Sequence, residues 1–136
     1  MTVLVDSNVI LDLFSEDPQW WSWSSGALGQ AAADGRLVIN PNVYGELSFR
    51  FESIEDLDDA LPPAIEREAI PYEAAFLAGM AFTAYRRRAG SAGRTSLLPD
   101  FYIGAHAAIR GYRLLTRDVA RYRTYFPKVA LIAPVP

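Results

Sequence analysis

The stretch Val-Leu-Val-Asp-Ser-Asn-Val-Ile-Leu-Asp at residues 3–12 decides the fold. Its first three residues form a short apolar run, which is typical of a strand buried on both faces. Apolar residues at helical spacing follow over residues 9–14, so a helix is expected within a few residues of the strand's end. Asp6 stands at this junction, and a strand that passes directly into a helix begins a strand–helix–strand unit.

The rest of the chain repeats this alternation of apolar strands and helices. A helix is expected over residues 18–34, with Asp17 as its N-cap and Pro18 in its first turn. Further helices are expected over residues 41–51, 53–61, 72–88, 99–110 and 118–125, and further strands over residues 37–39, 67–70, 114–115 and 129–132. Strands separated by helices predict an α/β fold, a three-layer α/β/α sandwich with a mainly parallel five-stranded sheet at its centre.

The composition indicates one globular domain and excludes several classes of site. The 136 residues are 51% hydrophobic and 21% charged, which suits a single domain over residues 1–136. Cysteine is absent and His106 is the only histidine, so disulfides, thiolate zinc sites and sites with two histidines are excluded. His106 itself is expected to be a packed helix residue. The chain has no apolar run long enough to cross a membrane and no signal-peptide pattern at its start, so we expect a cytoplasmic protein.

The charged residues are unevenly distributed along the chain. Residues 1–85 contain fourteen acidic and three basic side chains, whereas residues 86–136 contain two acidic and ten basic side chains. The net charges of the two parts are therefore −11 and +8. Such a split is typical of a protein that contacts a polyanion on one face. It is also expected if the two parts pair with each other in the fold, an explanation that the sequence alone slightly favours.

Acidic side chains are placed where the predicted strands end. Asp6 ends the first strand, Asp118 lies three residues beyond the fourth, and Glu46 lies in the early turns of the helix after the second. Because open parallel sheets bind ligands at the carboxyl ends of their strands, these three side chains are expected to converge. Asp100 begins the helix before the fourth strand and is expected at the far end of the sheet, unless the long loop over residues 90–98 carries it across.

Four carboxylates in one place would repel one another. A divalent cation that prefers hard oxygen ligands, Mg²⁺ or Mn²⁺, removes this conflict, and such a site can activate water and clamp a phosphodiester. Taken singly, each acid has a simpler explanation, since Asp6 and Asp100 are suitable helix caps and Glu46 a suitable surface residue. The joint placement of the four shifts the balance toward a metal site.

Four motifs, in order along nearly the whole chain, resemble those of PIN-domain ribonucleases. They are Val-Asp-Ser-Asn-Val-Ile-Leu-Asp at residues 5–12, Tyr-Gly-Glu-Leu-Ser at 44–48, Leu-Pro-Asp-Phe-Tyr-Ile-Gly-Ala-His-Ala at 98–107 and Leu-Leu-Thr-Arg-Asp at 114–118. The branch that the chain most resembles is the VapC toxins of bacterial toxin–antitoxin pairs, and the tail at residues 121–127 is similar to that branch as well. The resemblance implies a PIN-like sandwich, in agreement with the strand pattern.

The resemblance also implies a set of site residues and a reaction. The acids of the family fall on Asp6, Glu46, Asp100 and Asp118, and the polar residues that orient them fall on Asn8 and Thr116. Asp6 and Asp100 would hold the metal ion, Mg²⁺ with Mn²⁺ as a substitute, and the other two acids would complete its shell or orient the attacking water. The implied reaction is metal-dependent hydrolysis of RNA to a 5′-phosphate and a 3′-hydroxyl.

Arginines of the basic part are the candidates for RNA binding. They are Arg86, Arg87, Arg88, Arg94, Arg117 and Arg121. The first four are expected to form either a solvated helix end or a phosphate-binding patch, and the sequence favours neither. The last two flank Asp118 and are better placed to touch the scissile backbone or the acidic tail of an inhibitor.

We therefore expect a Mg²⁺-dependent endoribonuclease that is the toxin of a toxin–antitoxin pair and is silenced by a small VapB-like antitoxin. The alternatives are a PIN nuclease that processes RNA without being a toxin, and a catalytically silent PIN binding module. The antitoxin is expected to contact exposed aromatic side chains around Trp21. The helical stripe of Phe76, Leu77, Met80 and Ala84 is expected either to belong to the core or to form a two-fold homodimer.

Overall fold

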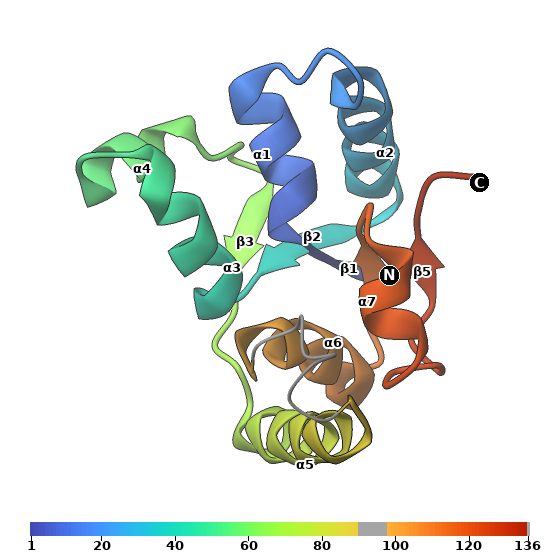
Figure 1. The fold of residues 1–136 in the computed structure, drawn as a ribbon. Helices are drawn as coiled ribbons and strands as arrows, with labels where there is room; N and C mark the ends of the chain where they lie inside the picture. The colour runs from blue at the N-terminus through green and yellow to red at the C-terminus, as the bar shows by residue number, and fades with distance from the viewer. Residues whose placement is uncertain (90–97, 136) are drawn as a thin grey trace.

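A five-stranded sheet forms the centre of the computed structural model, which describes residues 1–89 and 98–135 (Figure 1). The strands are β1 (Thr2–Val5), β2 (Arg36–Ile39), β3 (Ile65–Arg67), β4 (Arg113–Leu115) and β5 (Leu131–Ile132). Their spatial order is β3-β2-β1-β4-β5, and every neighbouring pair is parallel. The predicted parallel sheet is confirmed, and β1 lies where the strand order changes direction.

Helices cover both faces of the sheet, which confirms the predicted three-layer sandwich. They are α1 (Ser7–Ser15), α2 (Trp21–Asp34), α3 (Pro41–Leu47), the 3₁₀ turn η1 (Ser48–Arg50), α4 (Ile54–Ala60), α5 (Tyr72–Ala89), α6 (Leu98–Arg110) and α7 (Val119–Arg123). In Figure 1, α1 and α2 lie above the sheet, whereas α6 lies below it with α5 packed along its far side. No helix within residues 1–89 and 98–135 is long and apolar enough to span a membrane.

The middle strand β1 is buried from both sides, as its short apolar run predicts. Leu4 pairs in register with Val38 of β2 and with Leu114 of β4, and all three side chains are fully buried. Burial of each such side chain contributes about 2 kcal/mol to folding. The chain leaves β1 directly into α1 at Asp6, so the best-buried strand of the sheet also fixes the position of this carboxylate.

The edge strand β3 differs from the prediction. β3 covers Ile65–Arg67 and not residues 67–70. The reason is that Ile65 is the residue that pairs with the buried Leu37 of β2, while the Glu68 side chain turns to partners on other elements. The position of this short edge strand is therefore set by the apolar side chain that β2 buries, Ile65. Which residue that is depends on how the strands pair in the sheet.

Two helix boundaries also differ from the prediction. α2 begins at Trp21, because Asp17 caps the preceding turn by accepting hydrogen bonds from the backbone N–H groups of Gln19 and Trp20. The helix expected over residues 41–51 ends at Leu47 and continues only as the turn η1. The predicted loop around Arg94 lies in residues 90–97, outside the described residues.

Candidate active site

The four predicted acids lie at the carboxyl edge of the sheet. Asp6 follows β1 and Asp118 follows β4, and their side chains cap α1 and α7 by accepting hydrogen bonds from the backbone N–H groups of Ser7 and Arg121, respectively. Glu46 lies on α3, the helix that follows β2, and Asp100 lies in the first turn of α6. Asp6 and Asp118 therefore act as helix caps, and they also lie at the same edge of the sheet as Glu46 and Asp100, as a shared site requires.

The expectation that Asp100 lies at the far end of the sheet is wrong. A helix that connects parallel strands runs antiparallel to them, so α6, which directly precedes β4, starts at the carboxyl edge. There the Oδ1 atom of Asp100 lies 3.7 Å from Nη1 of Arg121, and the Nε atom of the same arginine lies 3.2 Å from Oδ2 of Asp118. The direction of α6 alone brings Asp100 to the other acids.

Asp6 is fully buried and is held by several donors at once. Its Oδ2 atom accepts hydrogen bonds from Thr116 Oγ1 at 2.7 Å and Tyr122 OH at 2.8 Å, and its Oδ1 atom accepts one from the Ser7 N–H at 2.8 Å. Burial raises the pKa of Asp6, although these hydrogen bonds act to lower it. The carboxylate is therefore fixed in orientation and costly to keep charged without a cation nearby.

Asn8 and Thr116 connect the start of α1 to the turn between β4 and α7. The Asn8 amide nitrogen lies 3.2 Å from Asp6 Oδ2 and 3.3 Å from Thr116 Oγ1, and its oxygen accepts the Arg117 N–H at 3.2 Å. Thr116 Oγ1 also accepts the Asp118 N–H at 3.0 Å. These hydrogen bonds fix the position of Asp6, after β1, relative to Asp118, after β4.

Glu46 is half-buried and close enough to the other acids to feel their charge. Burial, followed by the negative charges of Asp6 and Asp100, raises the pKa of Glu46, while Arg121 acts in the opposite direction. The neighbouring residue Asn42 donates to the Pro99 carbonyl at 3.0 Å, which ties α3 to the start of α6. Three of the acids thus influence one another electrostatically.

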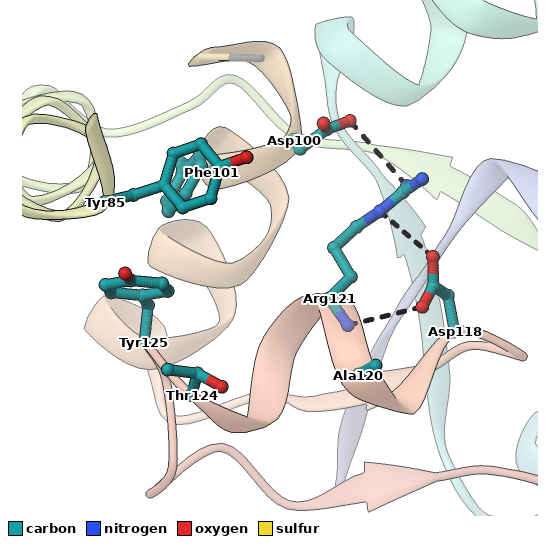
Figure 2. Close-up of a pocket in the computed structure, with 8 residues that line it drawn as sticks. All are labelled: Tyr85, Asp100, Phe101, Asp118, Ala120, Arg121, Thr124 and Tyr125. Atoms are coloured by element: carbon teal, nitrogen blue, oxygen red, sulfur yellow. Dashed lines mark hydrogen bonds and ion pairs between the residues drawn. The ribbon is translucent and has the colours of Figure 1, made fainter. Parts of the chain in front are cut away.

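Arg121 lies inside the acidic group, where Figure 2 shows it between Asp100 and Asp118. These residues line a pocket of about 400 Å³ together with Tyr85, Phe101, Ala120, Thr124 and Tyr125. Partial burial acts to lower the pKa of the guanidinium, but its neighbours Tyr122, Asp100 and Asp6 outweigh this and raise it. Arg121 therefore supplies a permanent positive charge among the carboxylates.

Arg117, expected at the scissile backbone, is engaged on the other side of the same turn. Its Nε and Nη2 atoms donate to the two carboxylate oxygens of Asp12 at 2.7 and 2.9 Å. Its guanidinium also lies over the Trp20 ring, 4.9 Å from the ring centroid. The side chain of Arg117 thus joins α1 and the segment before α2, and it is absent from the residues that line the pocket.

The donor set suits a hard divalent cation, although the described residues do not form a preassembled metal site. Within residues 1–89 and 98–135, no group of three or more acidic or histidine side chains is arranged to hold a metal ion. The chemistry nevertheless fits, because the acids provide only oxygen ligands, and because burial and, after it, the negative charges of Asp6 and Asp100 raise the pKa of Glu46, an effect that a bound cation would oppose. Arg121 occupies part of the space between two of the acids.

Tyr122 is the site residue that the sequence interpretation missed. Its fully buried hydroxyl donates to Asp6, and burial raises the pKa of Tyr122 well above 10, its ordinary value, so it is a donor at any physiological pH. The available signal was spacing, because Tyr122 lies four residues after Asp118 and thus on the same face of the short helix α7.

His106 belongs to a separate buried cluster, which confirms that it is a packed helix residue. Its Nε2 lies 2.7 Å from Glu68 Oε2, and its Nδ1 lies 3.2 Å from the Asn40 amide nitrogen. Tyr112 OH donates to the other Glu68 oxygen at 2.7 Å. Since Asn40 Oδ1 already accepts the Val43 N–H, its amide nitrogen donates to Nδ1 and the His106 proton resides on Nε2.

The remaining candidates lie on the surface. Arg86, Arg87 and Arg88 are exposed at the end of α5, and Arg94 lies outside the described residues. Trp21 is 46% exposed at the start of α2, as expected for a residue that faces a partner. The predicted α5 stripe is divided: Phe76 and Met80 are exposed and border a surface depression, whereas Leu77 packs against the core.

Comparison with known proteins places this geometry in a family. Residues 3–127 match the PIN domain family, and no curated protein sequence matches the chain. Similar solved structures are VapBC2 from Rickettsia felis bound to a promoter DNA fragment (17% identity, TM-score 0.73) and VapBC-1 from nontypeable Haemophilus influenzae (18% identity, TM-score 0.73). A toxin–antitoxin complex from Klebsiella pneumoniae is 20% identical with a TM-score of 0.62. Each comparison covers 98% of both chains, and at these identities it establishes a shared fold.

Proposed function

The chain belongs to the PIN domain family, and from this premise we propose that it is a Mg²⁺-dependent endoribonuclease that acts as the toxin of a toxin–antitoxin pair. The observation that carries the proposal is the convergence of Asp6, Glu46, Asp100 and Asp118 at the carboxyl edge beside β1. Carboxylates gathered in this way would hold a divalent cation, which would offset the negative charge by which a phosphodiester repels an attacking group.

In the proposed site, Asp6 and Asp100 hold the metal ion, with Mg²⁺ preferred and Mn²⁺ as a substitute. When bound, the ion lowers the pKa of water and neutralises charge on the phosphodiester. Glu46 and Asp118 complete the shell or orient the attacking water, and a carboxylate there can accept a proton from that water. Asn8 and Thr116 fix the relative positions of Asp6 and Asp118 through the hydrogen bonds described above.

Arg121 is the arginine best placed to contact the scissile phosphodiester, because it lines the same pocket as Asp100 and Asp118. Arg86, Arg87 and Arg88 form the exposed basic end of α5 and are proposed to bind RNA phosphates farther from the cut. Arg117 contributes only indirectly, because its side chain is committed to Asp12.

A small antitoxin is the proposed partner, since the fold is shared with proteins solved as VapBC and toxin–antitoxin complexes. Trp21, Phe49 and Ile54 are large apolar side chains exposed on the early helices, and a partner helix would cover them. The exposed side chains of Phe76 and Met80 on α5 are proposed to form a two-fold homodimer.

The decisive test is induction of the protein in cells, followed by mapping of new RNA 5′ ends. Wild type is expected to generate new ends and arrest growth, whereas Asp6→Asn is expected to do neither while remaining folded by circular dichroism. Asp59→Asn, the same change at an exposed position on α4, is the matched control and should behave as wild type. A fully active Asp6→Asn variant would overturn the proposed site.

Two further measurements separate the parts of the proposal. Cleavage of RNA by the purified protein should stop in EDTA and return with Mg²⁺ or Mn²⁺, and cleavage that survives thorough chelation contradicts the metal requirement. Co-expression with the adjacent small reading frame should relieve toxicity and give a complex in pull-down. A protein that cleaves RNA but is harmless alone and binds no small neighbour is instead an RNA-processing PIN nuclease.

A further inference from the structure

The pocket beside the acids has two chemically different sides. Figure 2 shows Asp100, Arg121 and Asp118 on one side and the rings of Tyr85 and Tyr125 on the other. The charged side comes from the starts of α6 and α7, and the aromatic side comes from α5 and the segment after α7. A site that only held a metal ion and water would not need the second side.

The size of the pocket is also larger than a metal site requires. Its volume of about 400 Å³ falls within the range of sites that take small organic ligands, roughly 300–1,000 Å³. The same volume would hold roughly a dozen waters at the density of the liquid. An organic group next to the acids, such as one nucleotide, matches both the volume and the mixed lining.

The aromatic side is built as a rigid platform. Phe101 is only 4% exposed, and its ring centroid lies 5.6 Å from those of both Tyr85 and Tyr125. The two tyrosines meet edge to face at 87°, with centroids 5.9 Å apart, and the Phe82 ring stacks against Tyr85 with centroids 6.2 Å apart. Both tyrosines are partly exposed and line the pocket.

We propose that Tyr85 and Tyr125 bind an unpaired nucleobase beside the phosphodiester that is cut, so that the pocket takes one nucleotide of single-stranded RNA. Arg121, which lies between Asp100 and Asp118 in the same pocket, is then placed to pair with the phosphate of that nucleotide. Stacking on tyrosine requires a base outside a duplex, so the pocket selects single-stranded segments and accepts any of the four bases to some degree. This inference rests on the proposed RNA cleavage.

The experiment measures binding of fluorescein-labelled 12-mers by anisotropy, with Asp6→Asn as the background to prevent cleavage. The probes are oligouridine and a ribose–phosphate 12-mer of the same charge that lacks bases. Tyr85→Leu and Tyr125→Leu are each expected to weaken oligouridine binding roughly ten-fold. Binding of the abasic probe should stay unchanged, because it reports only on phosphate contacts. Tyr85→Phe and Tyr125→Phe keep the ring and should bind within about two-fold of the background.

Phe82→Leu is the matched control within the same aromatic cluster. The Phe82 ring lies 5.5 Å from that of Phe101 and 6.2 Å from that of Tyr85, but Phe82 does not line the pocket. Its loss should perturb the packing without weakening oligouridine binding. Equal loss in Phe82→Leu, equal loss with the abasic probe, or unchanged binding in both tyrosine-to-leucine variants overturns the nucleobase subsite.

The failure of this inference is distinguishable from failure of the proposed function. If wild type cleaves RNA and the two tyrosine-to-leucine variants bind oligouridine as the background does, the subsite falls and the nuclease stands. If the wild type neither binds nor cleaves RNA, the proposed function fails and the subsite fails with it.

Discussion

Two arginines that lie four residues apart, Arg117 and Arg121, both pair with aspartates, yet the two pairs have different character. Arg117 meets the almost fully buried Asp12 with two short hydrogen bonds, and Ser24 Oγ donates to the same carboxylate at 2.6 Å. Arg121 lies in a pocket open to solvent and contacts Asp118 and Asp100 by single contacts of 3.2 and 3.7 Å.

The difference indicates which pair is structural and which is exchangeable. A bidentate pair whose carboxylate is buried and whose guanidinium lies over the Trp20 ring cannot open without leaving Asp12 in the core without its charged partner. A longer, partly exposed pair can open at little cost, so Arg121 is able to leave Asp100 or Asp118 when a cation or phosphate takes its place. Arg117 is thus a structural residue, called the anchor below. Arg121, four residues later, is free to change its partners and is called the working residue.

The largest expected effect is on stability and concerns the anchor. Arg117→Gln should lower the free energy of unfolding by about 3 kcal/mol, because Asp12 stays buried without its charged partner. Urea unfolding measures this loss. Arg123→Gln, the same change at an exposed position of α7, is the control and should leave stability unchanged within about 0.5 kcal/mol. A loss of the same size in both variants would remove the distinction between the pairs.

The second effect is on catalysis and concerns the working residue. Arg121→Gln should reduce RNA cleavage roughly 30-fold, about 2 kcal/mol of transition-state stabilisation, because a charge next to the scissile phosphate is lost. Circular dichroism should find the variant folded. Cleavage rates with oligoribonucleotides at saturating Mg²⁺ test the prediction, and wild-type activity in Arg121→Gln would return the arginine to a purely structural role.

The third effect is the salt dependence of the exposed pair. Arg121→Gln should cost less than about 1 kcal/mol of metal-free stability at low salt, and this cost should vanish in 1 M NaCl. The cost of Arg117→Gln should persist, because salt screens the interaction with the buried Asp12 carboxylate only weakly. Denaturant unfolding of both variants at two salt concentrations provides the comparison, and equal salt sensitivity would argue against it.

The smallest effect is on the pH dependence of the metal-free protein. Because the pKa of Glu46 is raised in the fold, the folded state binds its proton more tightly than the unfolded state does. Stability should therefore fall as the pH rises from the ordinary pKa of 4.5 through the raised value. Glu46→Gln should show a slightly higher melting temperature than wild type at pH 7.5 in EDTA and the same melting temperature at pH 4. The opposite sign at pH 7.5 would mean that attraction to Arg121 outweighs the burial and repulsion that act on the Glu46 carboxylate.

Much of the site was predictable because its residues stand at element boundaries. Asp6 and Asp118 follow apolar strands, and each is a good helix cap, so local sequence rules locate both. Asp100 was expected at the far end of the sheet, but α6 runs antiparallel to the strands and therefore starts at the carboxyl edge, next to Asp118. The partners of Arg117 and Arg121 could not be assigned, since both flank Asp118 in the sequence and only packing decides which way each side chain turns.

The sequence by itself determined the alternation of strands and helices and the acids at the strand ends, because apolar runs, helical spacing and caps are properties of a few neighbouring residues. The tertiary structure alone decided the strand order around β1, the hydroxyl of Tyr122 on Asp6, the Arg117–Asp12 anchor and the aromatic wall of the pocket. Tyr122 and Asp6 are 116 residues apart, and Arg117 and Asp12 are 105 apart. Contacts over such separations form only when the whole sheet closes around its middle strand, so no local pattern encodes them.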